Sequence, residues 1–130
     1  MSRRFLDASI GKAKELGVKV SVAVVDAHGD LVILERMAGA VSLSPKIAMG
    51  KASAAAIFMR PTAEFEPRVA QNSAFWAGVS SMTSGAVLFG RGGIPLKRGS
   101  ETVGAVGVSG ATSEQDEMIA QAAAAELDRE

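Results

Sequence analysis

The stretch that most constrains the fold is ETVGAVGVSGATSEQDE, residues 101–117. It reads as a strand, a glycine hinge and the start of a helix. Gly104 and Gly107 interrupt the apolar residues of the strand, and glycine inside a strand is typical of a place where another segment approaches closely. Beyond the hinge, Thr112 and Ser113 are both possible N-caps. Each is followed three residues later by a side chain that can complete a capping box. We therefore expect a closely packed strand that leads directly into a capped helix.

The rest of the chain is rich in hairpins and shows no strand–helix–strand alternation. Ser44-Pro45 is typical of a helix start, with the serine as cap and the proline in the first turn. Residues 68–84 are serine-rich and have no clear pattern, although the only tryptophan, Trp76, lies there as a candidate anchor in the core or at a subunit contact. Periodicity and turn residues predict helices at 3–16, 46–59 and 113–127, and strands at 18–25, 31–36, 86–89, 94–97 and 102–109. This order predicts one domain, residues 1–130, with an α+β fold in which helices pack on an antiparallel sheet of about five strands.

Composition narrows the classes of partner. Fourteen basic and fourteen acidic residues cancel, so charge gives no reason to expect nucleic acid or an anionic membrane surface. The chain has no cysteine, no apolar signal core and no apolar run of the ~18 residues that a membrane span needs. We expect a cytoplasmic protein. Alanine and glycine are abundant and aromatic residues make up 5%. Helix faces made of such small side chains bury little area, so we expect the chain to complete its burial as a homo-oligomer, a dimer or larger.

Four ordered motifs resemble the GlcG/HbpS-like family, also called the haem-degrading domain family, which includes the C-terminal domain of PduO-type proteins. They are VSVAVVDAHGDLVILERM (20–37), KIAMGKASAAAIFMRPT (46–62), GGIPLKRGSETVGAVGVSGA (92–111) and SEQDEMIAQAA (113–123). The resemblance implies a profilin-like fold and self-association. It also implies a pocket that in some members takes haem or another tetrapyrrole, in a protein accessory to a catabolic or stress pathway.

His28 is the only histidine and the candidate ligand of a haem iron or a general base. The alternative is a solvated residue in the turn between two strands. Asp26 can orient the imidazole or bind a cation, or it can form an Asx-type turn.

Cations and a helix start supply the remaining candidate ligand-binding residues. Lys51 and Arg36 are candidates to meet a carboxylate such as a haem propionate, although Lys51 also suits a surface lysine that lays its stem along the helix. The loop with Gly110, Thr112 and Ser113 is a candidate anion-binding site because it precedes a helix N-terminus. The two hydroxyls compete for the same backbone donors as caps.

The sequence leaves three functions open. The first is a small-molecule binding protein, with haem as the candidate ligand. The second is an enzyme that acts on a small oxygenated metabolite at a subunit-interface pocket, with acid–base groups among Asp26, His28 and Glu35 or with an anionic substrate on the Gly110–Ser113 loop. The third is an assembly or structural role.

Overall fold

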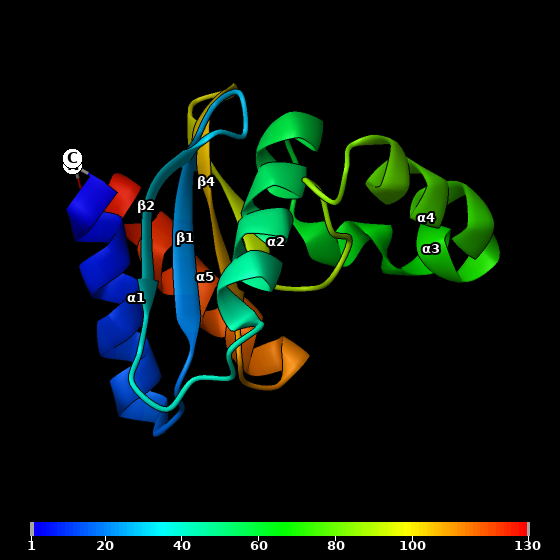
Figure 1. The fold of residues 1–130 in the computed structure, drawn as a ribbon. Coiled ribbons are helices and arrows are strands. Elements are labelled where there is room, and N and C mark those ends of the chain that lie inside the picture. The colour runs from blue at the N-terminus through cyan, green and yellow to red at the C-terminus, as the bar shows by residue number, and fades with distance from the viewer. Residues whose placement is uncertain (1, 130) are drawn as a thin grey trace.

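The alternating valines after residue 18 form the centre of a sheet. The computed structural model describes residues 2–129 and shows an α+β fold on a four-stranded antiparallel sheet with the order β2-β1-β4-β3 (Figure 1). Its elements are α1 (Ser2–Leu16), β1 (Ser21–Asp26), β2 (Leu31–Arg36), α2 (Ser44–Phe58), the short 3₁₀ helix η1 (Thr62–Phe65), α3 (Glu66–Gln71), α4 (Ser73–Met82), β3 (Gly93–Arg98), β4 (Glu101–Ser109) and α5 (Ser113–Leu127).

The two faces of the sheet are covered differently. α1 and α5 lie side by side on one face, and α2 lies on the other (Figure 1). The α1/α5 side holds the larger side chains, with Phe5, Leu6, Val22 and Ile119 among its buried residues. The α2 side is built mainly from alanine. The alanine helix therefore lies closer to the strands than a helix with long side chains does.

The glycines of β4 explain how closely α2 approaches. A Cβ at Gly107 would collide with the carbonyl oxygen of Ala48 and would lie 2.5 Å from the Ala52 nitrogen. The close approach expected from glycine within this strand is confirmed. The predicted capping box also forms, because Thr112 caps α5 and exchanges hydrogen bonds with Gln115.

The expectation of about five strands is wrong for the described residues, because residues 86–89 form no strand. This segment runs beside α2 instead, where the Leu88 N–H donates to the Gly50 carbonyl at 3.0 Å. The expected cap of α2 is also wrong. Ser44 is the first residue of the helix, and its hydroxyl donates to the Val41 carbonyl at 2.6 Å and hydrogen-bonds with Ser21.

Most of the stretch 68–84, in which the sequence shows no clear pattern, belongs to two short helices, α3 and α4, which together span residues 66–82. We call this pair the arm, because it extends away from the sheet (Figure 1). Neither helix has a buried residue. No helix among residues 2–129 is long and apolar enough to cross a membrane.

Candidate functional site

The sheet separates the candidate ligand-binding residues into two groups. In the antiparallel register, Asp26 pairs with Gly104 at one end of β1, and Ser21 pairs with Ser109 and Arg36 at the other. Five residue steps along a strand span about 17 Å. Asp26 and His28 therefore lie at one end of the sheet, whereas Arg36 and the Gly110–Ser113 loop lie at the opposite end. The structure does not bring the seven residues into one site.

The β1–β2 turn is held in place by its own side chains. Asp26 Oδ1 accepts hydrogen bonds from the backbone N–H groups of His28 at 2.9 Å and Asp30 at 3.1 Å, which is the Asx-type turn that the sequence suggests. Ser53 Oγ on α2 donates to the Gly29 carbonyl at 2.8 Å. The turn is thereby fixed against α2, and His28 is exposed at its tip.

A cleft lies between this turn and α2, and we call it the turn cleft. Its volume is about 330 Å³, at the lower end of the range of ligand pockets. It offers one cation, Lys46, one thioether, Met49, and one carboxylate, Asp30. The lining residues are Gly29, Asp30, Leu31, Lys46, Met49, Gly50, Ser53, Gly85 and Ala86. Lys46 and Met49 are not among the site residues that the sequence suggests, although their three-residue spacing places them on one helix face.

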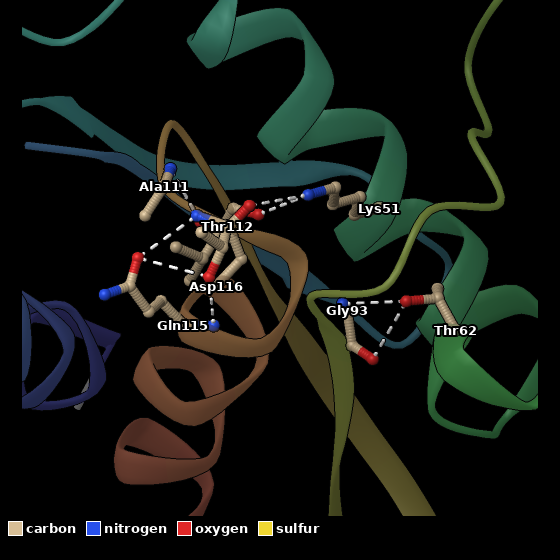
Figure 2. A network of polar contacts seen from close by, with 8 residues as sticks. Lys51, Thr62, Gly93, Ala111, Thr112, Gln115 and Asp116 are labelled. Carbon is tan, nitrogen blue, oxygen red and sulfur yellow. Dashed lines mark hydrogen bonds and ion pairs between the residues drawn. The ribbon is translucent and has the colours of Figure 1, made fainter.

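Lys51 does not lie at the surface, so its interpretation as a surface lysine is wrong. Its side chain is 8% exposed. Nζ donates to Asp116 Oδ2 at 3.1 Å and to the Val108 carbonyl at 2.8 Å (Figure 2). Because the Lys51 ammonium group already pairs with Asp116 inside the fold, it is not positioned to bind a ligand in the turn cleft.

Asp116 joins the same network from the first turn of α5. Its Oδ1 accepts a hydrogen bond from the Ala111 N–H at 3.0 Å (Figure 2). Burial raises the pKa of the Asp116 carboxyl above its usual value, although Lys51 and the backbone donors act in the opposite direction. No local pattern in the sequence connects Asp116 with Lys51, because the two residues lie 65 positions apart.

The start of α5 leaves few donors for an external anion. The Gln115 N–H donates to Thr112 Oγ1 and the Thr112 N–H donates to Gln115 Oε1, both at 3.2 Å. The Ala111 N–H is taken by Asp116. These backbone N–H groups are therefore hydrogen-bonded within the loop, as expected if its hydroxyls act as helix caps and do not leave the donors to an anion. Within residues 2–129, His, Cys, Asp and Glu side chains form no group of three that could hold a metal ion.

A second, more apolar groove lies between the arm and the segment that follows it, and we call it the arm groove. Its volume is about 390 Å³. Trp76 forms its centre and contacts Phe58, Phe65 and Phe89 with ring centroids 5.0–6.2 Å apart. The lining residues are Val69, Ser73, Trp76, Ala77, Ser80, Leu88, Phe89 and Gly90. The spacing of residues 73, 76, 77 and 80 was the sequence signal for this helix face.

An ion pair connects the base of the arm to the rest of the fold. The Arg91 guanidinium donates from Nε to Glu66 Oε1 at 2.8 Å, and Nη2 lies 2.6 Å from the same oxygen. Arg91 Nη1 also lies 3.8 Å from Glu117 of α5. Glu66 opens α3, so this contact sets where the arm begins.

Comparisons with known proteins agree with this fold. The model of the family described as haem degrading protein HbpS-like matches residues 2–125. Among solved structures, Klebsiella pneumoniae ORFY is 31% identical with a TM-score of 0.89, and covers 98% of this chain and 87% of that one. The structure titled PduOC:Heme Complex is 35% identical with a TM-score of 0.86, and covers 95% of this chain and 88% of that one. HbpS is 33% identical with a TM-score of 0.84, and covers 96% and 85%.

Two relatives by sequence extend the comparison. A protein of Citrobacter freundii, named as an uncharacterized 15.0 kDa protein of the dhaT–dhaS intergenic region, is 33% identical over 94% of this chain and 85% of its own length. The corrinoid adenosyltransferase PduO of Salmonella typhimurium is 36% identical over 92% of this chain, but the match spans only 35% of that enzyme. The match of the family model over nearly the whole chain shows that this protein belongs to the HbpS-like family.

Proposed function

We propose that the chain binds a tetrapyrrole, with haem as the first ligand to test and the turn cleft as its site. The observation that carries the proposal is the relative solved as a haem complex, which shares 35% of its residues and nearly the whole fold with this chain. The family description points to the same ligand class.

The donor set around the turn cleft fits this ligand. His28 lies next to Gly29 of the cleft wall, and Met49 lines the cleft; imidazole and thioether are both ligand types for haem iron. The Lys46 ammonium can pair with a propionate, the role first assigned to Lys51. Bound haem would supply an iron centre, and the protein would supply its axial ligand and a counter-charge. The cleft is small, so a macrocycle would extend beyond it.

A hemin titration followed in the Soret region tests the proposal. We expect a saturable, shifted band in the wild type, and a changed band position in His28→Ala if His28 ligates the iron. Met49→Leu tests the thioether, with Met118→Leu as the matched control because Met118 is an exposed methionine on the distant α5. We expect Lys46→Ala to weaken binding up to about five-fold, in line with a solvent-exposed ion pair.

The outcomes separate the claims. Absence of saturable hemin binding in the wild type contradicts haem as the ligand, and absence of cobalamin binding as well contradicts the proposed function. Binding with an identical spectrum in His28→Ala contradicts the iron ligand but not the function. Equal effects of Met49→Leu and Met118→Leu contradict a role for the cleft thioether.

A corrinoid is the second ligand of the same chemical class to test. The motivation is the name of PduO as a corrinoid adenosyltransferase, although this chain spans about a third of that enzyme. Competition of cobalamin with hemin for the same site would extend the ligand class beyond porphyrins. Cobalamin binding without hemin binding would replace haem as the ligand.

We also infer from the family resemblance a profilin-like arrangement of the layers and a homo-oligomeric state. Superposition on a profilin tests the first, and the solution mass tests the second. A cytoplasmic location is the matching expectation, and cell fractionation tests it.

A further inference from the structure

Most aromatic side chains of this chain lie outside its main core. The sequence has six aromatic residues, five phenylalanines and one tryptophan. Five of the six form one group of ring contacts at the arm groove: Phe58, Phe65, Phe75, Trp76 and Phe89. Of this group only Phe65 is buried, whereas the layers on both sides of the sheet are built mainly from aliphatic side chains. The arm groove therefore presents aromatic surface that the fold does not fully cover.

The walls of the arm groove are held in place before any ligand binds. Helices α3 and α4 form the arm side, and residues 88–90 form the other side. The Leu88 N–H donates to the Gly50 carbonyl of α2 at 3.0 Å, and the Arg91–Glu66 contact holds the start of α3. A groove that already has its bound shape loses little conformational freedom when a ligand enters.

The lining of the arm groove is uncharged. Among residues 2–129, those that line it include no Asp, Glu, Lys, Arg or His, and its polar side chains are the hydroxyls of Ser73 and Ser80. The turn cleft differs, because Lys46 and Asp30 lie in its wall. Transfer of an ion from water to an apolar site without a counter-charge costs free energy. The arm groove should therefore select against ions, including the propionates of haem.

We propose that the arm groove is a second ligand site, which binds an uncharged molecule with one or two aromatic rings. Its volume of about 390 Å³ lies within the range of small-molecule pockets. A bound ring meets Trp76 and Phe89, whose ring centroids are 5.0 Å apart, and paired aromatic rings gain free energy beyond the burial of their area. The hydroxyls of Ser73 and Ser80 can each form a hydrogen bond with a polar group of the ligand.

Two dyes that differ by one charged group test the ligand class. N-phenylnaphthylamine is uncharged, and anilinonaphthalenesulfonate has the same ring system with a sulfonate attached. Both emit strongly in apolar surroundings, so a titration of the full chain with no haem added gives a binding curve for each dye. We expect saturable binding of the uncharged dye. We expect at least ten-fold weaker binding of the sulfonate in the groove, because its charge would lie against an uncharged lining.

The variant Ala77→Leu locates the bound dye. Ala77 is exposed and lines the groove, so a larger side chain takes up groove volume without entering the core. We expect at least ten-fold weaker binding of the uncharged dye, because the added carbons occupy the place of its ring. Ala74→Leu is the matched control, since Ala74 is an exposed alanine of α4 that is not among the residues lining the groove. This control should bind as the wild type does, and circular dichroism verifies that both variants are folded.

The proposal is supported if the uncharged dye binds saturably, Ala77→Leu weakens its binding and Ala74→Leu does not. Four outcomes would each overturn it: no saturable binding of N-phenylnaphthylamine, wild-type affinity in Ala77→Leu, a loss in Ala74→Leu as large as in Ala77→Leu, or a sulfonate that binds as tightly with the same sensitivity to Ala77→Leu. No haem is present in these titrations, so their result is independent of the hemin titration.

Discussion

The buried pair of Lys51 and Asp116 is the clearest case in which single residues decide the stability of the fold. The two positions are 65 residues apart in sequence, and the lysine lies among alanines, so no local pattern connects them. The side chains are 8% and 4% exposed. A buried ion pair adds little over an apolar pair of the same size, but the removal of one partner leaves an uncompensated charge.

We therefore expect Lys51→Met alone to destabilise the protein by about 3–5 kcal/mol, because Asp116 then stays buried without its cation. The double variant Lys51→Met/Asp116→Leu should recover much of this loss. Lys46→Met on the same helix is the control, because Lys46 is exposed and should change stability by less than about 0.5 kcal/mol. Urea unfolding measures all three. Equal losses of stability in Lys46→Met and Lys51→Met would show that the buried ion pair does not contribute to stability.

The raised pKa of Asp116 predicts a pH dependence with a definite sign. The folded state holds this proton more tightly than the unfolded state does. The contribution of Asp116 to stability is thus fully present below the usual pKa of aspartate and is lost as pH rises through the raised pKa. The double variant lacks both groups and serves as reference. We expect the difference in unfolding free energy, wild type minus double variant, to fall as pH increases between about 3 and 7. A difference that rises over this interval would contradict the assignment.

At the scale of elements, the sequence correctly predicts the features that depend on residues close to one another in the chain. Both strands of the first hairpin, the Asx turn and the capping box of α5 follow from residues that are neighbours in the chain. The arm was missed because α3 and α4 are short and contain serine and proline. Residues 86–89 have strand-like side chains, but their backbone bonds to α2. The candidate ligand residues were grouped by chemistry, and only the register of β1 against its neighbours shows that they lie at opposite ends of the sheet.

The close contact of α2 with β4 predicts an asymmetry between two glycine substitutions. Gly107→Ala should destabilise the protein by about 1–3 kcal/mol or more, because the new methyl group would meet the backbone of Ala48 and Ala52. Gly11→Ala should stabilise it by about 0.5–1 kcal/mol, since Gly11 lies within α1 and no atom lies within 4 Å of the new Cβ. Thermal unfolding of the two variants makes the comparison. A neutral Gly107→Ala would mean that α2 can move away from the sheet at little cost.

At the scale of the whole molecule, the chain divides into a layered body and the arm that projects from it (Figure 1). The body contains the turn cleft, where we propose that the ligand binds, and the arm carries α4, which has no buried residue. The sequence predicted self-association from thin alanine helices. The structure places the most exposed apolar helix elsewhere, on α4.

The position of β1 has a consequence for synthesis of the protein. β1 is central in the sheet, yet one of its two neighbours is β4, so Ser21 must find Ser109. Until β4 has left the ribosome, the nascent chain can form only the β1–β2 hairpin of the sheet, and β1 lacks its second neighbour. Long-range strand pairing is slow and leaves apolar surface exposed while it is incomplete. We expect the native sheet to form only after β4 has left the ribosome, so the emerging chain exposes apolar surface that chaperones at the ribosome exit can bind.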